Sequence, residues 1–287
     1  MNNSWLFTIR KEDILTSLEL MDIKKGDVLL VHSALSSIGR VEGSAETVID
    51  AFIEAVGEEG TVVMSTLTGW SDSFDADSTP SAVGLITEKF RQRPQALRSL
   101  HPVHSVAAIG KYAEYITKDH DKCETGCGEE TPYLKIRDLG GKIVLLGVDM
   151  DRNTMMHSLE EEIDADYLLT LDIPAPTYIS GYKEKMFTLR KFPPGHRDFL
   201  KLTPYLRRKD AIIEGKIGNA VVKLIDSVKL FDVGLEVLKK DPMLFICHNV
   251  SCNFCNWARK QHSGEKADPA MYSGNGCVDD RCEICVI

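Results

Sequence analysis

A histidine and a glutamate near the middle of this 287-residue sequence have a spacing that could support proton transfer. His157 and Glu160 are three residues apart and would therefore share one face of a helix. A carboxylate beside an imidazole orients the ring and stabilises its protonated form, which is what a general base requires. The same spacing also fits an acidic helix start that carries an incidental histidine.

The C-terminal part of the sequence is rich in cysteine. Two copies of the spacing C-x4-C-x2-C follow one another, the first at Cys247, Cys252 and Cys255, the second at Cys277, Cys282 and Cys285. Structural disulfides rarely persist in a reducing cytosol, so paired C-x2-C motifs indicate thiolate ligands for a metal. The spacing predicts a tetrahedral zinc site made by Cys252, Cys255, Cys282 and Cys285.

Other interpretations of these cysteines remain open. An iron–sulfur site fits less well, because the plant-type pattern needs one distant fourth cysteine and here a second full triplet follows. Cys247 and Cys277, with His248 and His262, are alternative ligands, groups around the metal site or a redox pair. A C-terminal segment that binds no metal is the remaining alternative.

A turn rich in hydroxyl groups, Ser33 to Gly39, follows the first apolar run. Hydroxyls and backbone amides where a strand leads into a helix suit a phosphate or a pantetheine chain, although serine and glycine also form ordinary loops. His101 and His104 lie near the start of another strand, where a structural role is favoured over metal binding or proton transfer.

Composition and charge exclude several classes of function. The net charge of -9 and the pI of about 5.4 argue against nucleic-acid binding. The longest apolar run is much shorter than the ~20 residues of a membrane-spanning helix, and the first residues do not form a signal peptide, so we expect a cytoplasmic protein. The G-x-G-x-x-G, P-loop, G-x-S-x-G and H-E-x-x-H motifs are absent from the sequence.

Hydrophobic periodicity predicts an α/β fold with a mixed central sheet and flanking helices. Short apolar runs indicate buried strands, a stripe of apolar residues over 45–56 indicates a helix between the first two of them, and Ser44 is its expected N-cap. The expected strands are 28–31, 61–64, 105–109, 143–148, 178–189 and 220–230, and the other expected helices run from Thr79-Pro80 to Phe90 and over 232–240. We expect a domain over 1–244 and a cysteine-rich extension over 245–287.

Together these segments resemble the aminoglycoside 3-N-acetyltransferase family, antibiotic N-acetyltransferases whose fold is not the GNAT fold. The resemblance covers roughly residues 8 to 243 and rests on GDVLLVHSALSSIGRVEGSAETVIDAF, GTVVMSTLT, HPVHSVAAIG, CGEETPYLKI, GGKIVLLGVDMDRNTMMHSLEE and GKIGNAVVKLIDSVKLFDVGLEVL, in that order. It implies a resistance enzyme that acetylates an aminoglycoside, at the 3-amino group of 2-deoxystreptamine, with acetyl-coenzyme A as cosubstrate. A dimer is compatible with it.

The resemblance also implies roles for individual residues. His157 would deprotonate the attacking amine and Glu160 would orient it, while Asp72, Glu129 and His104 would lie on the side of the cationic substrate. Coenzyme A contacts would fall on Ser33, Ser36, Ser37, Ile38, Gly39, Ser105 and Val106, and backbone amides near Ser105 would hold the thioester oxygen.

Two alternatives to this activity follow from the same residues. Cys127 stands where the family usually has Phe, beside the expected acceptor site, which leaves room for an amine that is not an antibiotic. The cysteine-rich extension has no counterpart in the family pattern, so a metal-binding or redox-sensing protein on a scaffold without catalysis is the second alternative.

Overall fold

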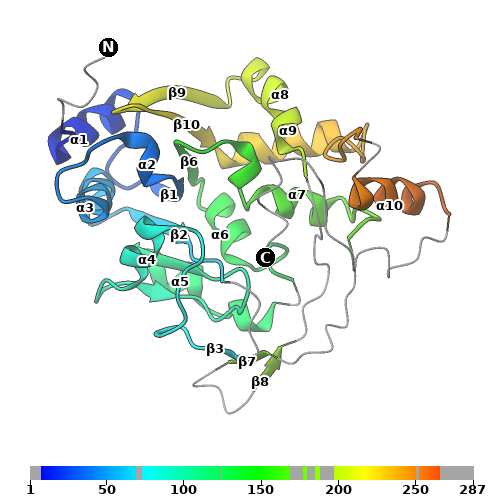
Figure 1. The fold of residues 1–287 in the computed structure, drawn as a ribbon, viewed down its shortest axis with the longest axis horizontal. Helices are drawn as coiled ribbons and strands as arrows, with labels where there is room; N and C mark the ends of the chain where they lie inside the picture. Colours follow the sequence, from blue (N-terminus) through cyan, green and yellow to red (C-terminus); the bar gives the residue numbers. More distant parts are fainter. Residues whose placement is uncertain are drawn as a thin grey trace.

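The apolar runs of the sequence form the middle of a mixed sheet (Figure 1). The structure is a computed structural model that describes residues 8–68, 73–123, 125–168, 177–179, 185–187, 197–249 and 252–265. Within these residues the main sheet has seven strands in the order β4-β5-β2-β1-β6-β10-β9. β1 pairs in parallel with β2 and β6, and the outer strands add in antiparallel fashion. The expected mixed α/β sheet is therefore confirmed.

The strands of the main sheet are short, and a small second sheet of order β3-β7-β8 accompanies them. The main-sheet strands are β1 Val28–Ser33, β2 Thr61–Ser65, β4 Leu97–Arg98, β5 Val106–Gly110, β6 Lys142–Leu146, β9 Ile212–Ile217 and β10 Ala220–Asp226. The small sheet is made of β3 Ser73–Phe74, β7 Thr177–Ile179 and β8 Lys185–Phe187.

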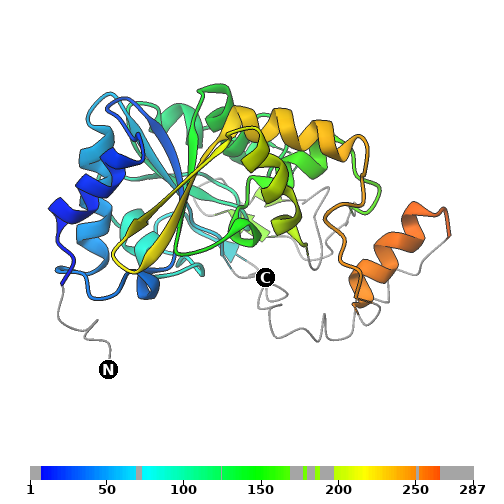
Figure 2. The same cartoon turned by 90° about the horizontal axis from the view of Figure 1, so that it is seen from above.

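Helices cover both faces of the main sheet, as Figures 1 and 2 show. One face packs on α1 Lys11–Leu20, α2 Leu35–Ile38, α3 Ala45–Val56 and α4 Leu85–Arg91. The opposite face packs on α5 Ala113–Thr117, α6 Pro132–Asp138, α7 Met156–Glu162, α8 Thr203–Arg208 and α9 Ser227–Leu238. The short 3-10 helices are η1 His120–Lys122, η2 Met150–Arg152 and η3 Phe199–Leu202.

Two separate cores follow from the alternation of side chains along the central strands. In β1, Leu29 and Val31 belong to the core on the α1–α3 side, whereas Val28 and Leu30 belong to the core on the α6–α9 side. Such strands are buried on both faces and are therefore apolar throughout, which is why the sequence shows them as continuous apolar runs.

Some element boundaries differ from those predicted. The helix expected from Pro80 begins only at Leu85, because residues 75–79 fold into a turn in which Thr79 and Asp75 bond each other, and Gly84 has a φ of 120°. The strand expected over 220–230 ends at Asp226, whose carboxylate accepts a hydrogen bond from the Lys229 N–H (3.0 Å) and so starts α9.

Two further boundaries also depart from expectation. Ser44 precedes α3, but its φ is 58° and its hydroxyl makes no cap hydrogen bond. The segment 178–189, expected as one alternating strand, contributes instead the antiparallel pair β7 and β8.

The described part of the C-terminal extension packs on the rest of the chain. Phe245 lies in the core beside α9, and α10 Asn253–His262 forms a third apolar cluster with Ala165 and Tyr167. The division into 1–244 and 245–287 stays a prediction. Over the part of the chain that the structure describes, every helix is too short or too polar to cross a membrane.

Candidate active site

The turns that follow β1 and β6 leave the same end of the sheet and touch each other. Ser33 pairs with Leu146 in the parallel ladder, so both strands end at one level. Gly147 then takes a φ of 67°, and a Cβ built on it would lie 1.7 Å from Ser37 Oγ. Ligands of open α/β sheets bind at this edge, beyond the carboxyl ends of parallel strands.

The predicted coenzyme turn presents only part of its residues to the surface. Ser36 and Gly39 are exposed, Ser33 and Ser37 are partly buried, and Ile38 is completely buried. The Ser37 hydroxyl donates to the Ala34 carbonyl (2.6 Å) and closes the turn. Gly39 has a φ of 98°, which favours glycine at the end of α2.

Ser105 and Val106 lie inside the protein, in contrast to the sequence expectation for them. Both are 0% exposed. The Ser105 hydroxyl donates to the Thr66 carbonyl (2.8 Å), and the Val106 N–H donates to Ser99 Oγ (2.9 Å). The Val106 amide is therefore already paired in this structure, and contacts of Ser105 and Val106 with coenzyme A stay a prediction.

His157 and Glu160 are brought together on α7, which begins shortly after β6. The Asp149 carboxylate accepts from the Met150 N–H (2.7 Å) and starts η2, and Asn153 Oδ1 accepts from the Met155 N–H (3.2 Å) just before α7. On this helix His157 Nδ1 lies 2.7 Å from Glu160 Oε2. The predicted pairing of the two side chains is therefore present in the structure.

A third residue, Arg197, completes the network. Its Nε donates to Glu160 Oε1, and both side chains are almost fully buried. Burial alone would raise the pKa of Glu160, but the guanidinium of Arg197 and the hydrogen bond from His157 outweigh it, so its pKa lies below the ordinary value. Glu160 is thus a carboxylate and accepts the hydrogen on His157 Nδ1, which leaves the lone pair of the imidazole on Nε2.

Exposure increases along this network towards His157. The side chains of Glu160 and Arg197 are 0% and 2% exposed, whereas that of His157 is 21% exposed. The His157 ring packs edge-on against Phe199, with ring centroids 5.0 Å apart. A fixed imidazole with Nε2 as its basic atom, backed by a buried carboxylate, is suited to general-base catalysis.

His104 lies close to this network but is buried among other histidines. The ring centroids of His101 and His104 are 5.4 Å apart, and those of His101 and His120 are 4.6 Å apart. Burial, reinforced by His157 and His120, lowers the pKa of His104 to about 3. The His104 side chain is therefore uncharged near neutral pH. Its contact with the substrate stays a prediction.

The loop that carries Glu129 packs directly on the same region. A Cβ at Gly126 would lie 2.2 Å from His104 Nδ1, and one at Gly128 would lie 2.2 Å from Glu161 Oε2. Glu129 itself is exposed. Asp72, the other residue expected on the substrate side, lies outside the described residues.

Two of the four predicted zinc ligands fall in the described part of the chain. Cys252 and Cys255 are buried, and their Sγ atoms lie within 4.8 Å of each other and of Cys247 Sγ. Cys282 and Cys285 lie outside the described residues.

Comparison with known proteins decides the family. The family model for aminoglycoside 3-N-acetyltransferases matches residues 30–239. The aminoglycoside N(3')-acetyltransferase-like protein YokD of Bacillus subtilis is 32% identical over an alignment 260 residues long, which covers 80% of this chain and 92% of that protein. The chain belongs to this family.

Other members of the antibiotic N-acetyltransferase family support the assignment. Aminoglycoside N(3)-acetyltransferase IV of Salmonella is 29% identical over 244 residues, with 83% of this chain and 90% of that protein covered. A solved histidine-to-alanine mutant of the aminoglycoside acetyltransferase AAC(3)-IVa, in complex with a gentamicin, is 28% identical with a TM-score of 0.81, over 89% of this chain and 98% of that one.

Arg197 of this acetyltransferase was not predicted from the sequence. It is 37 residues from Glu160 along the chain, so no helical or strand spacing links the two. Its only sequence signal is a charge just before Phe199 and Leu202, which are buried.

Proposed function

We propose that the protein transfers the acetyl group of acetyl-coenzyme A to an aminoglycoside, at the 3-amino group of its 2-deoxystreptamine ring, and so confers resistance. The observation that carries the proposal is the network of Arg197, Glu160 and His157 in a member of this acetyltransferase family. Only His157 in this network is partly exposed, as the residue that meets substrate must be.

His157 Nε2 takes a proton from the substrate nitrogen as that nitrogen attacks the thioester carbonyl. The new C–N bond forms, the C–S bond breaks, and coenzyme A leaves with its sulfur taking a proton. An amine with a pKa near ~8 is mostly protonated at neutral pH, so a base is needed to expose the lone pair. General-base assistance contributes roughly 10²–10⁴ in rate.

Acetyl-coenzyme A binds along the turn after β1. The partly or fully exposed groups of this turn belong to Ser33, Ser36, Ser37 and Gly39. Ile38 is buried and fixes the turn to the core. Ser105 and Val106 are buried, and Ser105 bonds the Thr66 carbonyl just after β2 (2.8 Å). The close contact of Ser37 with Gly147 keeps the turn next to the segment that leads to His157.

The acceptor is held by charge. An aminoglycoside is polycationic, and a chain of net charge -9 attracts it over several ångströms. Glu129, and Asp72 outside the described residues, are the proposed local partners, with His104 in the wall of the site. AAC(3)-IVa has been solved with a gentamicin and with apramycin, at 28% identity to this chain in both cases, which supports an aminoglycoside acceptor.

Zinc binding by the C-terminal cysteines is a separate proposal. The bond changes of acetyl transfer need only a base and two oriented substrates, so a metal at these cysteines would act on the surrounding structure and not on the reacting atoms. Thiolate ligands persist in a reducing compartment, which agrees with the cytoplasmic location that we propose.

Release of coenzyme A thiol tests the proposed activity. The protein, whose accessible thiols are first measured in a blank without acceptor, is mixed with acetyl-coenzyme A and with kanamycin, gentamicin or neomycin. We expect turnover with at least one of them, and product NMR to place the acetyl group on the 3-amino nitrogen. Turnover confined to amines that are not aminoglycosides would reject the antibiotic assignment. Failure to bind acetyl-coenzyme A would reject the whole proposal.

A further inference from the structure

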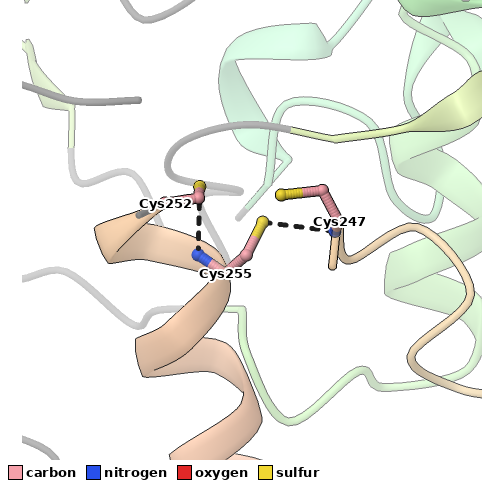
Figure 3. Close-up of side chains that lie close together, drawn as sticks. All are labelled: Cys247, Cys252 and Cys255. Atoms are coloured by element: carbon pink, nitrogen blue, oxygen red, sulfur yellow. Dashed lines mark hydrogen bonds between the residues drawn. The ribbon is translucent and has the colours of Figure 1, made fainter. Parts of the chain in front are cut away.

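Three cysteines outside the active site form a compact cluster at the start of α10 (Figure 3). The Sγ atoms of Cys247, Cys252 and Cys255 all lie within 4.8 Å of one another, and all three residues are buried. Sulfurs bound to one tetrahedral zinc ion at about 2.3 Å lie about 3.8 Å apart. The cluster therefore needs only a small contraction to accept zinc.

Backbone hydrogen bonds point at the sulfur atoms of this cluster. The Cys247 N–H donates to Cys255 Sγ (3.3 Å), and the Cys255 N–H donates to Cys252 Sγ (3.5 Å), as the dashed lines in Figure 3 show. Cys252 is the N-cap of α10, where the helix dipole favours a negative charge. Such donors orient and stabilise thiolates around a metal.

Cys247 is held against α10 from the other side as well. Arg259, on the last turn of this helix, donates from Nη1 to the Cys247 carbonyl and from Nη2 to Asn256 Oδ1 (2.6 Å). The third ligand thus comes from the segment before the C-x2-C pair.

The cluster is connected to the catalytic network through Phe254. Phe254 lies between Cys252 and Cys255 in the sequence. Its ring packs on the Arg197 guanidinium, with 4.4 Å from Cζ to the ring centroid. Tyr167 packs on the same guanidinium at 4.7 Å. Arg197 in turn binds Glu160, which holds His157.

Charge is complementary at this junction. Three thiolates around Zn²⁺ leave a net charge of about -1. The Arg197 guanidinium packs on the ring of Phe254, which directly precedes Cys255 in the sequence, in addition to its pairing with Glu160. A zinc thiolate centre would therefore place a negative charge near the buried Arg197 cation. That charge would stabilise Arg197 in the position where it donates to Glu160.

We propose that Cys247, Cys252 and Cys255 bind zinc, and that the metal centre fixes α10 so that Phe254 holds Arg197, and through Glu160 His157, in place. Phe254 is then a positioning residue. This catalytic part of the inference rests on the proposed acetyl transfer, whereas the metal site does not.

Zinc content of the full chain tests the site. Protein purified without oxygen is analysed for metals, together with the variants C247S, C252S, C255S, a C282S/C285S double variant and C123S as a cysteine outside the cluster. We expect about one zinc per chain, retained in C282S/C285S and C123S and reduced at least tenfold in the other three. Absence of zinc in the parent, or a disulfide among the three cysteines in that protein, would overturn the proposal.

The same set of variants separates this site from the one that the sequence predicts. Loss of zinc in C282S/C285S with retention in C247S would assign the metal to Cys252, Cys255, Cys282 and Cys285 and reject Cys247. Thermal unfolding of each variant with and without added zinc provides a readout that does not need the enzyme reaction. We expect added zinc to raise the unfolding temperature of the zinc-stripped parent but not of C252S.

The positioning role is tested at Phe254. F254L keeps most of the apolar volume but removes the aromatic face over Arg197, and F254Y keeps that face. We expect F254L to retain zinc, to lower kcat about tenfold and to leave both KM values within about twofold, while F254Y restores kcat. Unchanged kcat in zinc-loaded F254L would reject the link to His157. Absence of acetyl transfer in the parent would reject the proposed function and leave the metal result standing.

Discussion

At the scale of single residues, the site depends on how a buried charge pair fixes one imidazole. Burying Glu160 and Arg197 without each other would be costly, because an isolated ion loses its hydration in the interior. Their contact removes this cost and presents the second carboxylate oxygen to His157 Nδ1 (2.7 Å). Nε2 of His157 is consequently the atom available for proton transfer. Substitutions at His157 and at Glu160 should separate the role of the base from the role of the residue that orients it.

Replacing His157 by alanine should abolish most of the activity and leave the fold intact. We expect kcat to fall by roughly 10²–10⁴, since that is the usual contribution of a positioned general base. Both KM values should change by less than about threefold. Coenzyme A release measures the rate, and H262A is the matched control because His262 is exposed on α10 and pairs only at the surface with Asp166 (2.8 Å). Parent-like kcat in H157A would refute the base assignment.

Replacing Glu160 by glutamine should lower both rate and stability. The amide keeps the shape of the carboxylate but leaves the buried Arg197 cation without its anion, which typically costs about 3–5 kcal/mol. We expect kcat to fall about tenfold or more and the free energy of unfolding, from urea denaturation, to fall by about 3 kcal/mol. E162Q is the control, because Glu162 is exposed on the same helix. A similar small effect in both variants would contradict the network.

At the scale of elements, the coenzyme turn and the helix with the base are coupled through one close backbone contact. Gly147 ends β6 with a φ of 67°, directly against Ser37 of the turn after β1. The contact explains how two segments more than 100 residues apart can be held at one edge of the sheet. Gly140 provides a control for this contact, because its φ is almost the same and an added Cβ would meet no atom within 4 Å.

Alanine at Gly147 should weaken the binding of acetyl-coenzyme A. Its Cβ would lie 1.7 Å from Ser37 Oγ, so the turn must move. Gly140 has a φ of 66°, and a methyl group added to it would meet no atom within 4 Å, so G140A carries the same backbone strain without the clash. We expect KM for acetyl-coenzyme A to rise about tenfold in G147A and less than twofold in G140A, in steady-state kinetics. Equal KM values in the two variants would place the coenzyme elsewhere.

The elements that could be predicted from the sequence are those whose burial is regular. The central strands are apolar on both faces, and α3 has one clear apolar stripe, so their patterns stand out. Boundaries set by single side chains were missed, as at Asp226, because a cap depends on a local hydrogen bond and not on periodicity.

The same distinction holds for the site. His157 and Glu160 share a helix face, so spacing alone predicted their contact. Arg197 could not be predicted, because it reaches Glu160 only through the tertiary fold. The burial of Ser105 and Val106 was also invisible to a motif, since resemblance gives the sequence position of a residue and not its exposure.

At the scale of the whole molecule, four histidines among the described residues are buried and resist protonation. Burial lowers the pKa of His32 to about 4 and, with smaller contributions from neighbours, the pKa of His104 and of His120 to about 3; the pKa of His101 is lowered well below its ordinary value. These residues stay neutral in the folded protein, whereas an unfolded chain takes up protons on them below about pH 6.5. The unfolded state therefore binds more protons in mild acid.

Stability should consequently fall as the pH is lowered through 6.5 towards 4. By linkage, each such histidine contributes stability that is present above about pH 6.5, and each costs up to about 1.4 kcal/mol per pH unit below it. We expect the free energy of unfolding in urea to decrease by several kcal/mol between pH 7 and pH 5, a range in which most carboxylates are still ionised. A free energy of unfolding that does not change over this pH range would contradict the neutral state of the four buried histidines.

Substitution of one member identifies the origin of this slope. His120 is fully buried, with Nδ1 2.8 Å from Ser99 Oγ and Nε2 3.2 Å from the Gly126 carbonyl, so H120N keeps hydrogen-bonding capacity but cannot take up a proton. The variant will lose some stability at pH 7, yet its slope between pH 6 and pH 5 should be smaller by about one proton. An unchanged slope would exclude His120 as a source of the acid sensitivity, because the linkage relation depends only on the difference in bound protons.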